Sequence, residues 1–171
     1  MIFIGGVHGV GKSHFCKRVK EVTGIEVYSA STLIASKKHA GFKGDKLISG
    51  IDDNQQYLLQ AVSELRVSIR NFILDGHFCL LNDFGEVIRV SHDTFTTLRP
   101  DVIMLLTEKP EVIAARRMDR DGIEVSAHEI DAFQQEERAY AEEVADDLGV
   151  NLFVSTGTDN LAQAIEFIQS F

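Results

Sequence analysis

The most constraining feature of this sequence is an eight-residue segment near its start, Gly6-Val-His-Gly-Val-Gly-Lys-Ser13. It satisfies the pattern G-x-x-x-x-G-K-[ST], follows a short apolar run and precedes a stretch with apolar residues at helical spacing. A strand, a glycine-rich turn and a helix in this order form a cradle whose backbone N–H groups and helix N-terminus bind phosphate. The segment therefore predicts an α/β domain that binds a nucleoside triphosphate at the end of its first strand.

Individual positions of this segment have separate tasks. Gly9 and Gly11 allow the backbone to curl around the phosphates where larger side chains would clash. Lys12 is expected to reach the β- and γ-phosphates, and the Ser13 hydroxyl is expected to bind Mg²⁺. The cofactors that the segment predicts are therefore ATP and Mg²⁺.

Asp75 is the candidate for a second metal ligand and for a catalytic carboxylate. It ends the apolar run Phe72 to Leu74 and precedes a glycine. A strand beside the first one would place its carboxyl-terminal acid next to Ser13, at the edge of the sheet where α/β proteins bind ligands. Such an acid holds Mg²⁺ directly or through water.

Arginines follow the fourth apolar run. Arg116 and Arg120 are one helical turn apart, Arg117 and Arg120 are neighbours at three-residue spacing, and Arg138 lies on the next helix. These cations could simply be the solvated end of a helix. Phosphoryl transfer spreads negative charge over the γ-phosphate oxygens, however, and arginines stabilise that charge. We therefore expect at least one of them to be catalytic.

Short apolar runs alternate with longer amphipathic stretches, which favours an α/β domain with a mainly parallel sheet. Neither a repeat nor a linker interrupts the pattern, so residues 1–171 are expected to form one domain. A hairpin is expected at 77–90 and a glycine-punctuated loop at 41–50. The other expected elements are strands at 2–4, 25–28, 72–74, 102–106 and 152–154, and helices at 12–22, 31–39, 54–70, 110–117 and beyond, 126–148 and 161–168.

Composition excludes several classes of protein. A net charge of −9 argues against binding to extended nucleic acid. The first residues have no basic segment before their apolar run, and no run of 18 apolar residues occurs, so neither a secretory signal nor a membrane span is expected. Cys16 and Cys79 lack metal-ligand spacing and are expected to be free thiols. The sequence therefore predicts a soluble cytoplasmic protein.

With these motifs in this order, the chain resembles the adenylate kinase-like branch of P-loop nucleoside-monophosphate kinases. The resemblance is greatest to the compact archaeal-type adenylate kinases, and looser to shikimate and gluconate kinases. It implies a P-loop NTPase three-layer sandwich, with helices on both faces of a five-stranded parallel sheet in the order 2-3-1-4-5, and it admits an oligomer. The segments that carry it are the phosphate-binding segment above, FILDGH at 72–77, RPDVIMLL at 99–106, RRMDRDG at 116–122 and EIDAFQQEERAYA at 129–141.

The same resemblance implies roles for residues at the nucleotide. Asp75 would organise the waters of Mg²⁺, Arg116 or Arg117 would lie near the adenine, and Arg120 and Arg138 would clamp the transferring phosphoryl group. A short lid would extend over about 120–127. The triphosphate and base would contact residues before and after these: Gly9, Val10, Gly11, Lys12, Ser13, His14, and the segment from Ser155 to Gly157.

An acceptor-binding arm would extend over about 29–60, and here the sequence departs from the family. Longer bacterial monophosphate kinases have S-T-G-D and then an arginine after the second strand, whereas this chain has S-A-S-T at 29–32 with Lys37 and Lys38. His77 follows the third strand where the family has an arginine, and Arg89 across the hairpin is the candidate replacement. His77 is equally compatible with a structural role and with an acceptor contact.

Three functions remain open. The first is a phosphotransferase whose acceptor is a nucleoside monophosphate such as AMP, for which Lys37, Lys38 and Arg89 would supply cations. The second is a kinase for a hydroxyl on a nucleoside, a sugar acid or an RNA end. The third is an ATPase or ATP-dependent regulatory protein. A hydroxyl acceptor requires a carboxylate to take its proton, and the candidates are Asp45, Asp52, Asp53 and Asp75.

Overall fold

A five-stranded parallel sheet organises the molecule. The computed structural model describes residues 1–39, 51–82, 84–157 and 160–171, with the backbone alone for 51–53. The sheet has the order β2-β3-β1-β6-β7. Counted among themselves, these strands follow the order 2-3-1-4-5, so the predicted topology is confirmed. Their bounds are β1 (Ile2–Gly5), β2 (Glu26–Ser29), β3 (Phe72–Asp75), β6 (Val102–Thr107) and β7 (Asn151–Thr156).

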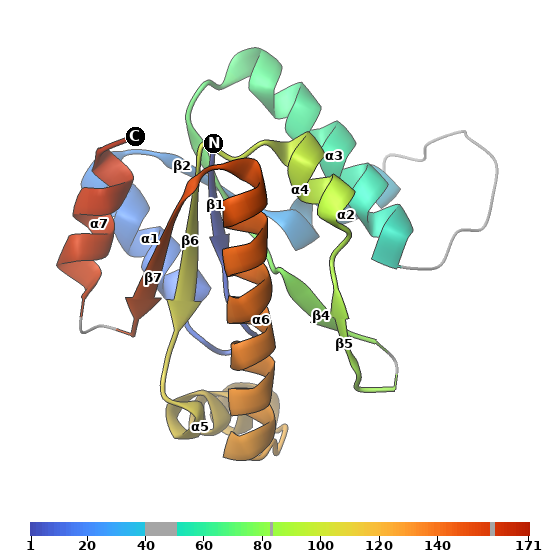
Figure 1. Cartoon of the computed structure of the whole chain (residues 1–171), viewed down its shortest axis with the longest axis vertical. Helices are drawn as coiled ribbons and strands as arrows, with labels where there is room; N and C mark the ends of the chain where they lie inside the picture. Colours follow the sequence, from blue (N-terminus) through green and yellow to red (C-terminus); the bar gives the residue numbers. More distant parts are fainter. Residues whose placement is uncertain (40–50, 83, 158–159) are drawn as a thin grey trace.

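Helices cover both faces of this sheet, as Figure 1 shows. On one face, α1 (Lys12–Thr23) contacts β2 and β3, and α7 (Leu161–Gln169) contacts β7. On the other face, α6 (Ala127–Leu148) packs on β6 and β7. Right-handed crossovers that run in opposite directions from the central strand place their helices on opposite faces in this way. The expected three-layer sandwich is therefore confirmed.

The remaining helices flank the layer of α6. The segment after β2 forms α2 (Ala30–His39) and α3 (Ile51–Ser68), and α3 packs against a short helix, α4 (His92–Leu98). No helix was expected over α4. Three of its seven residues are threonine, a poor helix former, and Phe95 and Leu98 are its buried apolar side chains. Burial of those two side chains, rather than local propensity, determines this helix.

Most helix ends follow the sequence signals. Gly24 and Gly149 end α1 and α6 in the left-handed conformation, with φ of 73° and 65°. Ser126 and Glu129 form the expected capping box at the start of α6. The expected hairpin is also present, as β4 (Cys79–Leu81) and β5 (Val87–Arg89).

The three central strands β3, β1 and β6 are buried, and all five strands point their carboxyl ends to one edge of the sheet. Beyond that edge lie α5 (Pro110–Asp121) and the hairpin (Figure 1). Ile4 pairs with Asp75 in the neighbouring strand, so the Asp75 carboxylate lies directly beside the start of the segment 6–13. Among the described residues, no helix is long and apolar enough to cross a membrane. The expected loop at 41–50 lies outside the described residues.

Candidate functional site

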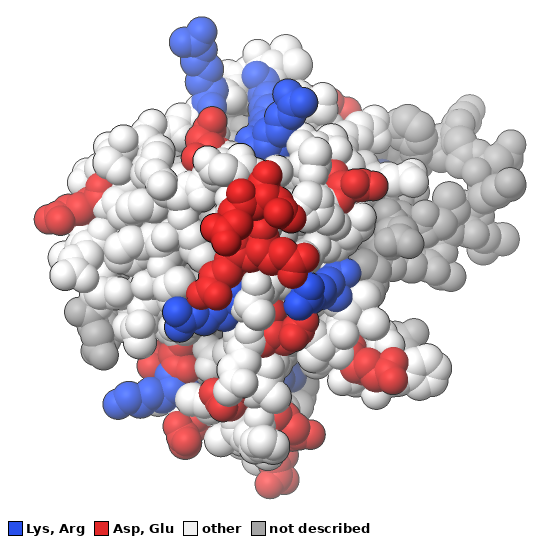
Figure 2. All heavy atoms as spheres, in the orientation of Figure 1, with Lys and Arg blue, Asp and Glu red and all other residues white. Residues whose placement is uncertain are grey.

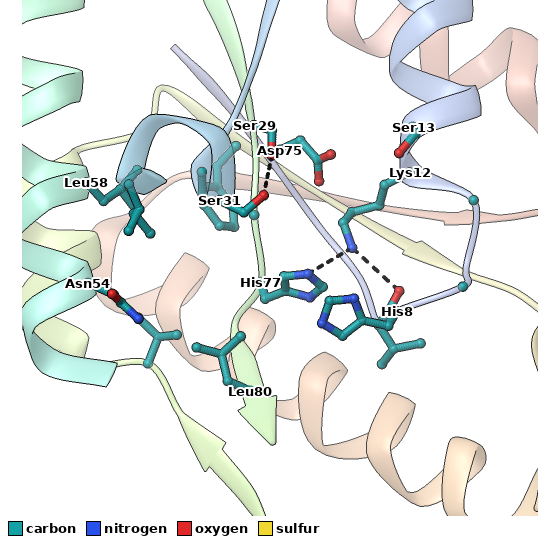
Figure 3. Close-up of a pocket in the computed structure, with 18 of the residues that line it drawn as sticks. His8, Lys12, Ser13, Ser29, Ser31, Asn54, Leu58, Asp75, His77 and Leu80 are labelled. Atoms are coloured by element: carbon teal, nitrogen blue, oxygen red, sulfur yellow. Dashed lines mark hydrogen bonds between the residues drawn. The ribbon is translucent and has the colours of Figure 1, made fainter. Parts of the chain in front are cut away.

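A cavity of about 720 Å³ lies at the carboxyl ends of β1, β2 and β3. One wall is formed by residues 6–13, called the phosphate loop below, together with the start of α1 and part of α5. The opposite wall is formed by α2, α3, α4 and the hairpin. Figure 3 shows His8 and Lys12 on one side, Asn54 and Leu58 on the other, and His77 between them. The cavity therefore has a loop end and an opposite end.

Lys12 is buried at the loop end, with 8% of its surface exposed. Its Nζ donates to the carbonyl oxygen of Gly6 at 2.5 Å. The same Nζ lies 3.4 Å from Nε2 of His77 (Figure 3). Burial lowers the pKa of Lys12, whereas the carboxylates of Asp75 and Glu137 raise it. The ammonium is thus confined at the position where the motif predicts a phosphate contact.

The backbone of the phosphate loop adopts the curvature that its glycines predict. Gly9 and Gly11 have φ of 87° and 110°, a region that side chains disfavour. A Cβ at Gly9 would lie 2.9 Å from Cγ of Arg117, so α5 approaches the loop too closely for any larger residue. Val10 is buried and its carbonyl accepts a hydrogen bond from Arg116 at 2.9 Å. A curled loop that opens a helix fits a triphosphate.

Ser13, His14 and Asp75 all line the same cavity. Burial raises the pKa of Asp75, and the charge of Lys12 lowers it. The described residues contain no group of three or more His, Cys, Asp or Glu side chains able to hold a metal. Mg²⁺ is commonly held by one or two protein oxygens together with substrate phosphates and water. A hydroxyl and a carboxylate beside a phosphate cradle therefore fit Mg²⁺ in that mode.

Two of the three arginines of α5 line the cavity. Arg116 donates to Val10 and pairs with Glu108 at 3.1 Å. Arg120 lies at the cavity with an exposed side chain that pairs with its neighbour Asp121 at 2.6 Å. Arg117 instead packs along Gly9, and its buried Nε has no partner among the described residues. The structure thus gathers the predicted arginine cluster at the loop end.

Arg138 is not brought to the cavity. It lies on the exposed face of α6, where its Nε donates to Glu142 at 2.8 Å. The physical reason is helical geometry: Glu137 points into the core, and the next side chain is turned by about 100°. The expected clamp of Arg120 with Arg138 is therefore not formed in this structure.

Ser155 and Gly157 also lie outside the cavity. The Ser155 hydroxyl is buried and donates to Asn160 at 2.9 Å. A Cβ at Gly157 would lie 2.7 Å from the carboxylate of Glu108, which pairs with Arg116. This end of β7 is thus connected to the arginine cluster through Glu108, on the outer side of the phosphate loop.

The basic residues expected at the acceptor do not line the cavity. Lys37 pairs with Glu64 at 2.5 Å on α3. Arg89 donates to Glu136 at 2.6 Å and to Glu143 at 2.8 Å, so it joins the hairpin to α6. Lys38 is exposed. The observation that favoured a phosphate-bearing acceptor is therefore lost for the described residues, while Asp45 and the side chains of Asp52 and Asp53 lie outside them.

Glu137 is a residue that the sequence reasoning missed. Its carboxylate is 1% exposed and accepts three backbone hydrogen bonds, from Gly6 at 3.1 Å, Phe78 at 3.0 Å and Cys79 at 2.6 Å. It thereby joins the phosphate loop to the segment after β3. A signal was present in the sequence, because Glu137 occupies an apolar-face position of α6 between Phe133 and Tyr140.

His77, which the sequence left open between a structural role and an acceptor contact, forms a second feature together with His8. Their rings lie 4.3 Å apart, and both line the cavity. Burial, followed by the charge of Lys12 and the neighbouring His8, lowers the pKa of His77 to about 2. Its Nδ1 has no partner among the described residues. His77 is therefore an uncharged side chain that contacts the loop lysine and faces the acceptor side.

Comparisons with known proteins agree with this architecture. Residues 5–134 match a family model described as AAA domain. A gluconokinase from Sinorhizobium meliloti 1021 superposes with a TM-score of 0.56 at 19% identity, covering 99% of this chain and 89% of the other. A sugar kinase from Janibacter sp. HTCC2649 gives a TM-score of 0.54 at 20% identity, covering 99% and 91%. No curated protein matches. The two structures share the fold of this chain.

Proposed function

We propose that this chain, which belongs to the AAA domain family, is an ATP- and Mg²⁺-dependent kinase that transfers a γ-phosphoryl group to a hydroxyl of a small molecule. One observation carries the proposal: Lys12, Ser13 and Asp75 line one cavity, whose second end carries no charged side chain among the described residues. The first of these supplies a phosphate contact, and the other two supply oxygen ligands for a metal.

The wall opposite the phosphate loop, formed by α2, α3, α4 and the hairpin, is called the far wall below. Its side chains favour a hydroxyl acceptor over a nucleoside monophosphate. A phosphate on the acceptor would call for arginine or lysine partners, and the described residues of that wall include neither. The basic residues that supported AMP as acceptor form ion pairs elsewhere, Lys37 with Glu64 and Arg89 with α6. Two proteins with the same fold are described as a gluconokinase and a sugar kinase, which supports a small-molecule hydroxyl acceptor.

In the proposed reaction, the acceptor hydroxyl oxygen forms a bond to the γ-phosphorus. The bond from that phosphorus to the β,γ-bridging oxygen breaks, and ADP leaves. Asp75 would take the hydroxyl proton, since a carboxylate beside the reacting oxygen can act as the general base. Bound Mg²⁺ would supply charge neutralisation at the phosphates, with Ser13 as a protein ligand and Asp75 holding it through water.

The cations at the loop end would stabilise the charge on the transferring group. Lys12 is held there by burial, and Arg116 and Arg120 reach the same cavity from α5. Residues 120–127 join α5 to α6 and are proposed as a short lid that excludes water on closing. Residues 1–171 are proposed to act as one domain, with 29–60 as the acceptor arm.

The outer face of α6 supports a small acceptor rather than an extended polyanion. Acidic side chains gather over this helix in Figure 2. Its exposed acids include Glu142, Glu143, Asp146 and Asp147. A polyanion would be repelled from this face.

Acceptor-dependent release of ADP tests the proposed function. Lys12→Ala should weaken ATP·Mg binding by about 10- to 100-fold, because a charge-assisted contact of about 1.5–3 kcal/mol is lost. Lys20→Ala, on the same helix but exposed and paired with Glu26, is the matched control and should bind like the wild type. Calorimetry gives both affinities, and equal affinities in the two variants would refute the site.

The products of the reaction separate a kinase from an ATP-binding regulator, and Asp75→Asn is the variant that tests the site. It should lower acceptor-dependent turnover by roughly 10²–10⁴-fold, because the proton acceptor is lost. The amounts of ADP, phosphorylated acceptor and inorganic phosphate are measured. The wild type should form ADP and phosphorylated acceptor in equal amounts. Release of inorganic phosphate at the same rate with and without every acceptor would identify an ATPase instead.

A further inference from the structure

We infer that the acceptor end of the cavity binds an uncharged hydroxyl compound built on a flat, largely apolar ring, of the size and hydrogen-bonding character of a nucleoside. This inference rests on the proposed function, since it names the substrate class of the same site. Three observations carry it: the far wall is apolar, the described charges of the cavity lie at the loop end, and two adjacent amide side chains line the far end.

The lining is apolar and partly aromatic. Six hydrophobic side chains from α2, α3, the hairpin and α4 form the far wall: Ile34, Leu58, Leu80, Val90, Phe95 and Leu98. Phe3 adds an edge beneath them, with its ring 5.4 Å from that of Phe95. A wall of this kind stabilises an apolar face of a ligand by burying it, and aromatic rings pack well against another flat ring. A compound that exposes only hydroxyls would leave this wall unused.

Charges occur only at the loop end among the described residues that line the cavity. The cations are Lys12, Arg116 and Arg120, and the acids are Asp75 and Asp119. His77 stands between the two ends and contacts Lys12 on the loop side, with its Nε2 3.4 Å from the ammonium (Figure 3). A carboxylate or phosphate at the far end would lose its hydration, and the described residues there offer no cationic side chain to replace it. It would also meet the repulsion of Asp75.

Amide side chains offer the far end its directional hydrogen bonds. Asn54 and Gln55 are adjacent on α3 and both line the cavity. Gln55 is 8% exposed, and the enclosed Oδ1 of Asn54 has no partner among the described residues. A buried amide oxygen without a partner is unfavourable, and a ligand N–H or O–H would supply the missing hydrogen bond. Amides provide both donors and acceptors, as the edge of a nucleobase requires.

A panel of matched acceptors tests the inference. The pairs are adenosine with AMP, cytidine with CMP, and glucose with gluconate, each with ATP·Mg and a no-acceptor control. A neutral nucleoside should be phosphorylated with a kcat/KM at least tenfold higher than its monophosphate and than either sugar compound. Preference for AMP, CMP or gluconate would overturn the inference while leaving the kinase proposal intact.

Variants on α3 connect any preference to this wall. Asn54→Ala should raise the KM for the preferred nucleoside about tenfold with little change in ATP affinity, because only the acceptor loses a contact. Gln56→Ala, two residues along but exposed, is the matched control and should keep the wild-type KM. Equal KM values in the two variants would overturn the assignment of the amides.

A binding measurement distinguishes failure of the inference from failure of the proposed function. Calorimetry with nucleosides in the absence of ATP should show saturable binding that Asn54→Ala weakens. That result without any phosphoryl transfer would support the acceptor class and refute the kinase. Transfer to a charged acceptor without nucleoside binding would support the kinase and refute the acceptor class.

Discussion

His77 shows how strongly one side chain in this cavity depends on its surroundings. It contacts the Lys12 ammonium, lies against the tilted ring of His8 and has a pKa lowered to about 2, chiefly by burial. Because an unfolded histidine has a pKa near 6.5, the folded protein binds fewer protons than the unfolded chain between these two values. The contribution of His77 to stability must therefore fall as the pH falls below about 6.5.

A prediction at the residue scale follows from that difference. Below pH 6.5 His77 should cost the wild type up to about 1.4 kcal/mol of unfolding free energy per pH unit. His77→Asn removes the titrating group, so its stability should decline less between pH 7 and pH 5. Urea unfolding at several pH values measures this. His39→Asn, at an exposed position, is the control and should follow the wild type; parallel curves for His77→Asn would contradict the prediction.

Single residues differ in how far the sequence alone could assign them. Lys12, Ser13 and Asp75 were predictable because a local pattern fixes their place beside one strand end. Glu137 was not predicted, although an acid within the apolar stripe of α6 was a usable signal. Its partners, the amides of Gly6 and Phe78, lie more than 50 residues away in the chain. Only the fold brings such partners together.

At the scale of elements, the contact between α5 and the phosphate loop depends on one glycine. The φ of Gly9 is 87°, and a Cβ there would press on Arg117 and on Ile113, at 2.9 and 3.2 Å. Gly85 has a similar φ of 79° but open space around it. An alanine at either position would strain the backbone, but only an alanine at Gly9 would also clash with neighbouring side chains. Comparing the two variants therefore separates the two effects.

Gly9→Ala should lower ATP affinity and stability more than Gly85→Ala. Both variants carry the strain of a left-handed residue, on the order of 1–2 kcal/mol, and only Gly9→Ala also forces α5 away from the loop. Thermal unfolding and ATP titration compare the pair. Similar losses of ATP affinity in both variants would show that the packing of α5 on the loop does not matter for binding.

Elements were predicted well where local chemistry sets their ends. The capping box at Ser126 and the terminal Gly149 fix α6, and Pro110 stands at the start of α5. The short helix α4 was missed because its seven residues carry no such signal, and its Phe95 is ordered by stacking on Phe78 at 5.0 Å. Tertiary contacts override weak propensity in segments of this length.

At the scale of the whole molecule, the reactivity of two buried thiols can show whether the chain unfolds as one cooperative unit. Cys16 lies on α1 on one face of the sheet, and Cys79 begins the hairpin at the edge. Both are buried, and burial raises the pKa of each to about 12. A thiol in this state reacts only when the structure around it opens, because the thiolate is the reactive form.

If residues 1–171 form one cooperative unit, both thiols should become reactive with the same free energy of opening. Labelling of Cys16→Ala and Cys79→Ala variants under native conditions, across a urea series, measures the two sites separately. The two opening free energies should agree within about 0.5 kcal/mol and match global unfolding. A clearly lower value at Cys79 would show that the hairpin opens by itself.

The overall topology could be expected from the order of strands and helices together with the family resemblance, and the sheet order 2-3-1-4-5 bears this out. Side-chain direction could not. Arg138 and Arg89 were candidates for the site, yet both extend to acids on α6, because a one-residue step on a helix or strand changes the face. The ion-pair partners of long charged side chains depend on which surface residues the fold brings together, and a sequence pattern does not show this.

The contacts of Lys12 have a consequence for how tightly a triphosphate is held. Its ammonium already has two oxygen acceptors within its own loop, Gly6 at 2.5 Å and Val7 at 3.5 Å, and an imidazole beside it. A phosphate group must compete with these internal partners, so the measured affinity reflects an exchange of contacts. Weakening an internal partner should then tighten nucleotide binding, and an ATP titration of His77→Asn would detect this as a lower Kd than that of the wild type.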